Sequence, residues 1–253
     1  MELAGRVAIV TGAAGAGIGQ ADVWALARNG ANVVVSDSHH SRPFALANKV
    51  KESTGTDTLG IQCDVSKRDQ VEKMIEKTMD RFGHIDILVN NAGTNRVFPI
   101  WEVTEEIWNM VIDINLTGVF HCTQAVLPFM MKQRKGSIIN MSSIAAYVCS
   151  PMDAAAYCSA KAGVIAFTKE VAKEVGQYNI RINAITPSVI WNEFLAHVPG
   201  LKQEDLEEIK KETPLGRFGN PEEIANAVVF LASDKSSFTS GTVISITGGY
   251  HTW

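Results

Sequence analysis

Cysteine is scarce in this sequence, and the few that occur form no pattern. The chain has four, at Cys63, Cys122, Cys149 and Cys158, with no Cys-x-x-Cys pair among them. This scatter argues against a structural zinc site and against a disulfide framework, because both need cysteines at defined spacings. A reducing, cytoplasmic compartment is therefore expected.

The sequence also lacks a long apolar run and a strong excess of charge. No apolar run approaches the about 20 residues of a membrane-spanning helix. The first residues, Met1 to Arg6, do not combine a basic segment with an apolar core, as a signal peptide would. The net charge of −4 gives no reason to expect nucleic acid or an acidic membrane as a partner. The rest of the composition, with 46% hydrophobic and 20% charged residues, is typical of a globular protein.

The first part of the chain has a strand–turn–helix–strand pattern. Residues 6–10 and 31–37 are β-branched runs, and residues 21–30 have a helical pattern that ends in glycine. Four glycines lie between the first strand and the helix, at Gly12, Gly15, Gly17 and Gly19. Such glycines let a backbone approach the pyrophosphate of a dinucleotide, which the helix N-terminus also attracts. The pattern predicts dinucleotide binding, although a tight turn that needs glycine only for packing would look similar.

Asp37 bears on the choice of cofactor. It lies 20 residues after Gly17, where a carboxylate can accept hydrogen bonds from the adenosine ribose. The same carboxylate would repel a 2′-phosphate, and the glycine turn has no Lys or Arg to offset that repulsion. NAD is therefore expected in preference to NADP, and only Arg42 weakens this expectation. The nearby His39 and His40 are interpreted as loop residues and not as metal ligands.

The remainder of the chain continues to alternate between strands and helices. Strands are predicted over residues 58–63, 85–89, 136–141, 179–186 and 241–246, and helices over 41–53, 67–82, 104–131, 154–176 and 221–232. Gly118 is expected to interrupt the third of these helices, and Pro128 to end or kink it. The pattern predicts one α/β domain over residues 1–253, a Rossmann fold with a doubly wound seven-stranded parallel sheet and helices on both faces. A substrate lid is predicted at about 188–213.

Tyr157 and Lys161 stand one turn apart on the helix predicted over residues 154–176. A neighbouring ammonium favours phenolate, so we expect the pKa of Tyr157 to fall below its ordinary value of about 10. Such a phenol can take a proton from an alcohol or give one to a carbonyl oxygen, and Ser143 could donate a hydrogen bond to the same oxygen. The same spacing also occurs by chance on many helices.

The other motifs favour the functional interpretation of this pair. The glycine turn, residues 90–93, Ser143 and residues 186–187 each follow directly after a predicted strand. Parallel strands end at one edge of a sheet, where open α/β folds bind their ligands. Residues far apart in the sequence are therefore expected to meet at this edge.

Together these motifs resemble those of the short-chain dehydrogenase/reductase family, over essentially the whole chain. The resemblance rests on Thr11-Gly12, Gly17-Ile18-Gly19, Asp64-Val65, Asn90-Asn91-Ala92-Gly93, Asn115, Ser143, Tyr157-x-x-x-Lys161, Asn183 with Pro187, and the segment from Gly216 to Ala225. It implies a catalytic tetrad of Asn115, Ser143, Tyr157 and Lys161. It also implies a cofactor site formed by Gly12, Gly17, Ile18, Gly19, Asp37, Asp64, Val65, Asn91, Ala92, Gly93, Tyr157, Lys161, Pro187 and Val189. No metal is implied.

The sequence departs from the family pattern at several points. Four residues separate Gly12 from Gly17, one more than in most members. Ser143 and Tyr157 are 14 positions apart, again one more than usual. Ser188 follows Pro187 where Gly is usual, and Thr247 precedes the late glycines where Asp is usual. The longer turn leaves the geometry around the pyrophosphate open.

Several functions remain compatible with the sequence. The first is hydride transfer between NAD(H) and a secondary alcohol or ketone of apolar character, with Tyr157 as general acid/base. The alternatives are an NADPH-dependent 3-oxoacyl thioester reductase, a dehydratase or epimerase that uses the cofactor transiently, and a non-catalytic NAD-sensing protein. Surplus apolar residues on the helices over 104–131 and 154–176 predict an oligomer interface, and the resemblance implies a homotetramer.

Overall fold

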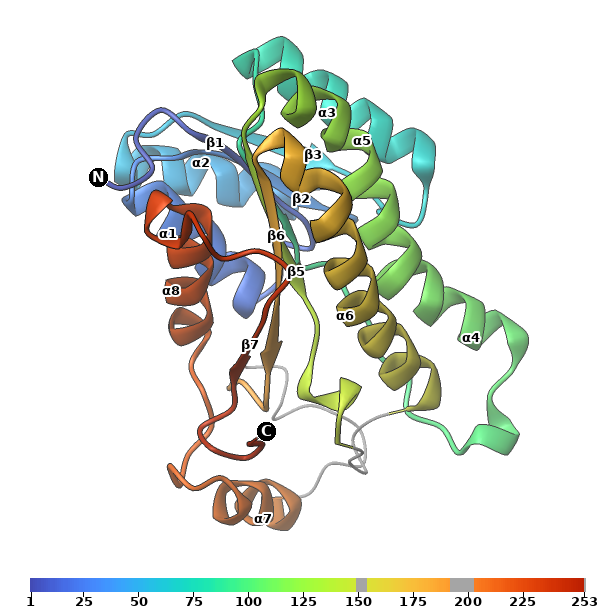
Figure 1. Ribbon diagram of the computed structural model, residues 1–253. Coiled ribbons are helices and arrows are strands. Elements are labelled where there is room, and N and C mark those ends of the chain that lie inside the picture. Colours follow the sequence, from blue (N-terminus) through green and yellow to red (C-terminus); the bar gives the residue numbers. More distant parts are fainter. Residues whose placement is uncertain (149–153, 192–202, 253) are drawn as a thin grey trace.

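The computed structural model describes residues 1–148, 154–191 and 203–252. Its centre is a seven-stranded parallel sheet with the strand order β3-β2-β1-β4-β5-β6-β7 (Figure 1). The strands are β1 (Val7–Val10), β2 (Asn32–Asp37), β3 (Thr58–Gln62), β4 (Ile87–Asn90), β5 (Gly136–Met141), β6 (Ile180–Pro187) and β7 (Val243–Ile246). The predicted fold class is confirmed. The order reverses between β1 and β4, which is where such sheets bind ligands.

Helices cover both faces of the sheet and form two separate hydrophobic clusters with it (Figure 1). They are α1 (Ile18–Arg28), α2 (Arg42–Thr54), α3 (Arg68–Phe82), α4 (Glu105–Ile112), α5 (Gly118–Gln133), α6 (Ala155–Val175), α7 (Gln203–Glu212) and α8 (Pro221–Ala232). Buried residues of α1, α2 and α8 pack on one face. Those of α3, α5 and α6 pack on the other. Side chains alternate between the faces along each strand, so both faces of the central strands are apolar.

The helix predicted over residues 104–131 is broken at a different place from the one expected. A single π-helical turn, η2 (Asp113–Thr117), joins α4 to α5, and Gly118 is already inside the regular helix. Pro128 lies within α5 and does not end it. Glu105–Gln133 is long and apolar enough to qualify as a membrane span by composition, with a mean hydropathy of 1.3. In the fold, however, its buried residues pack against the sheet as a core helix.

A chain of buried amides and hydroxyls crosses the sheet behind the carboxyl ends of β4 and β5. Asn90 Nδ2 donates to Asn140 Oδ1 at 2.8 Å and to Thr123 Oγ1 at 3.1 Å. Asn140 Nδ2 in turn donates to Thr168 Oγ1 on α6 at 2.9 Å. Buried polar groups are tolerated when they are paired in this way, and the bonds fix how α6 sits on β5.

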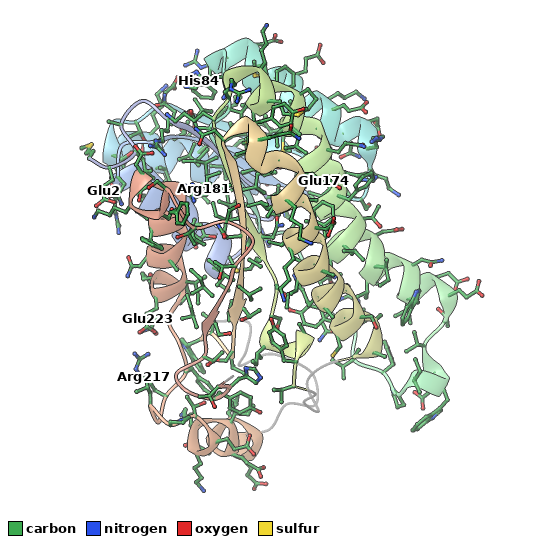
Figure 2. The ribbon with its side chains drawn as sticks, in the orientation of Figure 1. Glu2, His84, Glu174, Arg181, Arg217 and Glu223 are labelled. Atoms are coloured by element: carbon green, nitrogen blue, oxygen red, sulfur yellow. The ribbon has the colours of Figure 1, made fainter. Side chains whose placement is uncertain are left out.

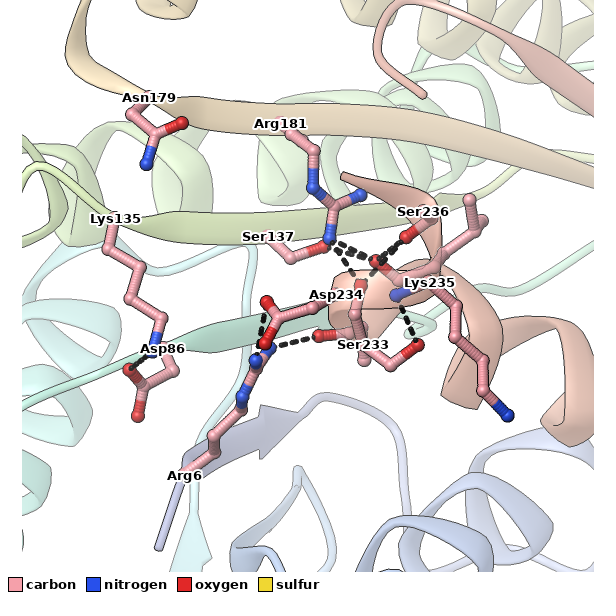
Figure 3. Close-up of polar contacts among 12 residues, drawn as sticks. Arg6, Asp86, Lys135, Ser137, Asn179, Arg181, Ser233, Asp234, Lys235 and Ser236 are labelled. Carbon is pink, nitrogen blue, oxygen red and sulfur yellow. Dashed lines mark hydrogen bonds and ion pairs between the residues drawn. The ribbon is translucent and has the colours of Figure 1, made fainter. Parts of the chain in front are cut away.

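Arginines close the opposite, amino-terminal edge of the sheet (Figure 3). Arg6, just before β1, donates to the carbonyl of Ala232 and pairs with Asp234 at 2.7 Å. Arg181 on β6 donates to the carbonyls of Leu231 and Ser233. These bonds satisfy the last carbonyls of α8, which have no partner within the helix. They hold that helix at the end remote from the carboxyl edge.

Asp22 is an exception to the rule that buried polar groups are paired. It lies on α1 with no exposed surface, and neither carboxylate oxygen has a hydrogen-bond partner among the described residues. Burial raises the pKa of this carboxyl well above its ordinary value, because the charged form loses its hydration. The core beneath α1 therefore contains a carboxyl group whose burial lowers the stability of the fold.

Candidate active site

A cleft with a volume of about 700 Å³ opens at the carboxyl edge of the sheet. Most of the predicted site residues line it: Gly12, Gly17, Ile18, Gly19, Asp37, Asp64, Val65, Asn91, Ala92, Gly93, Ser143, Tyr157, Lys161 and Pro187. They come from the ends of β1, β2, β4, β5 and β6, from the start of α1 and α6, and from the segment after β3. The convergence expected from parallel strands is therefore present.

The glycine turn is packed tightly against the end of β4. A Cβ on Gly12 would lie 2.6 Å from Ala92 Cα, and one on Gly19 would lie 2.7 Å from Gly12 O. Gly12 also has a φ of +60°, which favours glycine. Asn91 Nδ2 donates to the carbonyls of Thr11 and Gly12, both at 3.0 Å. The turn is thus a bare backbone cradle before a helix N-terminus, which fits a dinucleotide pyrophosphate.

The additional residue in the turn leaves this cradle intact. A Cβ on Gly15 would meet nothing within 4 Å, so this middle part of the turn faces open space. Ala13 N donates to Ser36 O at 2.9 Å, and Ala14 N donates to Asp37 Oδ2 at 2.9 Å. The longer turn is therefore anchored on the end of β2.

Asp37 ends β2 at the rim of the cleft, where its carboxylate accepts from two backbone amides. Besides Ala14 N, it accepts from His39 N at 3.0 Å. Two carboxylate oxygens offer about four acceptor positions, so the group can still accept from ribose hydroxyls. Among the described residues that line the cleft, Lys161 is the one cation, and Arg42 lies outside it on the exposed start of α2. The end of the cleft that holds Asp37 is therefore acidic.

Asn115 lies beneath the cleft, in the π-helical turn η2. It is fully buried. Its Nδ2 donates to Thr94 O at 2.7 Å and to Val111 O at 2.8 Å, and its Oδ1 accepts from Thr94 N at 3.3 Å. Single π turns often occur at functional sites because they redirect a side chain. Here the turn lets Asn115 bind the loop that follows β4.

Lys161 lies under Tyr157 at the start of α6. Its side chain is buried, and its Nζ donates to Met141 O at 2.8 Å and lies 5.5 Å from the centre of the Tyr157 ring. Burial lowers the pKa of Lys161 to about 8, because the ammonium has lost most of its hydration. The predicted pairing of the two residues on one helical face is present. The lowered pKa of Tyr157 stays a prediction.

Ser143 follows β5 and begins the short 3₁₀ turn η3 (Ile144–Ala146). Its Oγ accepts from Ala145 N at 3.1 Å, which leaves the hydroxyl proton available for a second partner. The adjacent Ser142 Oγ donates to the carbonyl of Lys161 at 2.8 Å. This bond connects the segment after β5 to α6. These two elements carry Ser143 and Tyr157, which are expected to contact the substrate oxygen.

Val189 is not among the residues that line the cleft, although its neighbours Ser188 and Ile190 are, and its role at the cofactor stays a prediction. It packs against Leu206, Ile209 and Phe218, in a small apolar cluster that holds α7. Arg217 and Glu223 form a bidentate ion pair next to this cluster, at 2.7 and 2.8 Å (Figure 2). The pair holds the pKa of Glu223 at about 2. Residues 192–202 of the predicted lid lie outside the described residues.

Several residues at the site were not predicted. Thr11 Oγ1 accepts from Asn91 N and Ala92 N, both at 3.1 Å, and Met141 lines the cleft and accepts from Lys161 Nζ with its carbonyl oxygen. The sequence feature that could have identified Thr11 and Met141 is their position next to the glycine turn and next to the serines at 142–143. His251 near the C-terminus stacks on Tyr147 of the Ser143 loop, with ring centres 5.2 Å apart and an interplanar angle of 8°. Nothing in the sequence relates those two residues. Across the described ranges, no three His, Cys, Asp or Glu side chains gather as metal ligands would.

Comparison with known proteins agrees with this geometry. The family model described as enoyl-(acyl carrier protein) reductase matches residues 12–251. A 3-oxoacyl-(acyl-carrier-protein) reductase of Thermotoga maritima is 42% identical over 253 residues, which covers 98% of this chain and 99% of the relative. The reductase of the same name from Synechocystis is 40% identical, with 98% and 97% covered.

Solved structures of similar proteins have the same fold. The crystal structure of levodione reductase superimposes with a TM-score of 0.91 at 33% identity and covers 97% of both chains. A short-chain type dehydrogenase/reductase from Mycobacterium marinum gives a TM-score of 0.91 at 34% identity, with 98% of this chain and 96% of that chain covered. Fold and sequence therefore agree over the full length.

Proposed function

This chain belongs to the short-chain dehydrogenase/reductase family, and from that premise we propose that it reduces the 3-carbonyl of a 3-oxoacyl thioester with NADH. The enzyme class itself follows from the family: an NAD(P)-dependent oxidoreductase that interconverts CH–OH and C=O groups. The substrate class is carried by one observation, the full-length similarity at 42% and 40% identity to two 3-oxoacyl-(acyl-carrier-protein) reductases. A non-catalytic NAD sensor is not supported, because the family is enzymatic.

The proposed mechanism assigns one task to each residue of the tetrad. The glycine turn and Asp37 would hold the dinucleotide, and the reduced nicotinamide would supply the hydride for the carbonyl carbon. Tyr157 donates a proton to the carbonyl oxygen, so that hydride and proton together convert C=O into CH–OH. Ser143 donates a hydrogen bond to the same oxygen and stabilises the charge that develops there. Lys161, as a buried ammonium, favours the phenolate that Tyr157 becomes after the transfer.

Asn115 acts on this site through the backbone. Its bonds to Thr94 hold the loop after β4. That loop approaches Lys161 closely, because a Cβ on Gly93 would lie 2.9 Å from Asn115 Oδ1 and 3.5 Å from Lys161 Nζ. We infer that Asn115 keeps Lys161 at the correct distance from Tyr157. Small errors in such positioning have large effects on rate.

The preference for NADH rests on Asp37. The carboxylate repels a 2′-phosphate, and no described residue that lines the cleft near it offers a compensating positive charge. We expect NADH to bind at least about tenfold more tightly than NADPH, since one poorly screened charge repulsion exceeds about 1.4 kcal/mol. Fluorescence titration with both cofactors measures this. Asp37→Asn should reduce the difference in affinity between NADH and NADPH. If the variant keeps the wild-type preference for NADH, residues other than Asp37 determine that preference.

The substrate proposal is tested by the loss of NADH absorbance with acetoacetyl thioesters of coenzyme A and of acyl carrier protein. Turnover of both supports the proposal, and Tyr157→Phe serves as the control that should retain NADH binding and lose turnover. If the wild-type chain binds NADH but reduces neither thioester, the substrate class is wrong. Acyl turnover with no net oxidation of NADH would indicate a dehydratase or epimerase.

A second candidate is a reductase of cyclic or other secondary ketones. It is favoured by the similarity to levodione reductase, which superimposes with a TM-score of 0.91. A panel of cyclic ketones and secondary alcohols, assayed in both directions with NAD(H), distinguishes it from the thioester reductase. A higher kcat/KM for ketones than for acetoacetyl thioesters would favour this candidate.

We also propose a homotetramer in the cytoplasm. Exposed apolar side chains support assembly, among them Phe120 on α5 and Phe230 on α8, which are 39% and 40% exposed and lie on opposite sides of the sheet. Two separate interfaces would give the dihedral symmetry usual for tetramers. Light scattering coupled to size exclusion measures the mass directly.

A further inference from the structure

Ser188 directly follows β6 and lines the cleft. The neighbouring strand sets its place there, because Met141 is paired with Ile185, and Ser142 N donates to Ile185 O at 2.8 Å. The first residues beyond β6 therefore lie beside the loop that carries Ser143. Glycine is usual at the position of Ser188, so this chain has a hydroxyl in the cleft that the catalytic tetrad does not use.

The backbone around Ser188 is held on both sides. Ser188 N donates to Ile246 O, at the end of β7, at 3.2 Å. Gly219 N donates to Val189 O at 3.1 Å, and Trp191 N donates to Gly219 O at 2.8 Å. These bonds fix the short segment after β6, so the hydroxyl is in place before a ligand binds and little entropy is lost on binding.

The side chains of this segment face two different ways. Val189 packs against Leu206 and Phe218, in the apolar cluster that holds α7. Ser188 and Ile190, one residue to either side of Val189, line the cleft instead. This is the alternation of an extended backbone. The hydroxyl of Ser188 therefore belongs to the side of the segment that faces the cleft and not to the side that faces α7.

The hydroxyl is also the donor that this turn has left for a ligand. Pro187 has no N–H group, and the N–H of Ser188 is taken by Ile246 O. Among the described residues, Ser188 forms its hydrogen bonds through the backbone alone. The nearby Ser142 Oγ, in contrast, is already bonded to the carbonyl of Lys161.

We propose that the Ser188 hydroxyl binds the carboxamide of the nicotinamide ring and thereby positions that ring for hydride transfer. This inference rests on the cofactor assigned in the proposed function. Hydride transfer requires the ring to lie beside Tyr157 and Ser143, which line the same cleft as Ser188. A carboxamide has one acceptor and two donors. These groups lose water when the ring is buried, so each needs a partner from the protein.

The test compares the affinity for NADH with that for ADP-ribose, which lacks the nicotinamide, by calorimetric titration. For Ser188→Ala we expect the Kd of NADH to rise about two- to tenfold, which corresponds to the net contribution of one hydrogen bond. The Kd of ADP-ribose should not change. Ser188→Thr keeps a hydroxyl on extended backbone and should retain the wild-type Kd for NADH. Ser237→Ala, at an exposed position, is the matched control and should change neither affinity.

Two results in Ser188→Ala would overturn the proposal. An equal loss of affinity for NADH and ADP-ribose would show that the substitution disturbs the cleft as a whole. An unchanged Kd for NADH, with a higher KM for acetoacetyl coenzyme A, would assign the hydroxyl to the substrate. A loss that is confined to NADH and absent in Ser188→Thr supports the proposal. If the wild-type chain binds neither NADH nor NADPH, the proposed function fails instead.

Discussion

Replacing the buried carboxyl of Asp22 should make the protein more stable. A buried polar group without a partner costs about 1–3 kcal/mol, and both oxygens of Asp22 are in this situation. Ala is also a better helix former than Asp, by about half a kcal/mol in the interior of a helix such as α1. The small cavity left by the carboxyl offsets part of this gain. We expect Asp22→Ala to raise the free energy of unfolding by about 1–3 kcal/mol near pH 7.

The gain should depend on pH with a definite sign. The folded-state pKa of Asp22 is raised above its unfolded value of about 4. The cost of Asp22 to the free energy of unfolding is therefore smallest below pH 4 and grows as the pH rises towards the folded-state pKa. The advantage of Asp22→Ala should therefore grow over this window, by up to about 1.4 kcal/mol per pH unit.

Urea unfolding of both proteins at several pH values measures the gain, and thermal unfolding should show a rise of about 2–4 °C for each kcal/mol. Asp80→Ala, at an exposed position on α3, is the matched control and should change little. A less stable Asp22→Ala protein, or a gain that is the same at every pH, would show that the carboxyl is paired or hydrated in solution.

Three further predictions concern the cleft. The Tyr157→Phe variant should bind NADH normally, but its kcat should be about 10²–10⁴-fold lower. A wild-type rate of hydride transfer in single-turnover assays with bound NADH would contradict the acid/base role of Tyr157. Because burial lowers the pKa of Lys161 to about 8, the group loses its charge as the pH rises through that value, so kcat/KM for reduction should fall there. A pH profile that is flat through 8 would refute this. Gly19→Ala would place a Cβ 2.7 Å from Gly12 O and should weaken NADH binding about tenfold or more in fluorescence titration, with catalysis by the loaded enzyme less affected.

The regular parts of the fold could be predicted from the sequence because each rests on a local pattern. The β-branched runs gave every strand of the sheet to within a few residues, and the helix over 221–232 was predicted with its observed limits. The glycine turn and the spacing of Tyr157 and Lys161 are equally local. Their meeting at one edge followed from the parallel order of the strands.

The features that could not be predicted depend on contacts between distant residues. The break in the long helix was expected at Gly118, but it lies at the π turn that contains Asn115. This turn is five residues long and allows Asn115 to bind Thr94. The packing of Val189 against Leu206 and Phe218 likewise joins residues from separate segments. The pairing of His251 with Tyr147 joins residues more than one hundred positions apart and has no signature in either segment.

The bonds of Asn91 have a consequence for how proteins of this kind can diversify. They connect β4 to the glycine turn at the boundary where the strand order reverses, beside the backbone pairing of β1 with β4 that joins the two halves of the sheet. One half, β1 to β3, carries Asp37, which we propose selects the cofactor, and the other carries Ser143, Tyr157 and Lys161. Recombination with a relative at the short segment between α3 and β4 would exchange one half and keep the other. Provided that Thr11 and Asn91 still find matching partners, coenzyme preference and carbonyl chemistry can be inherited separately.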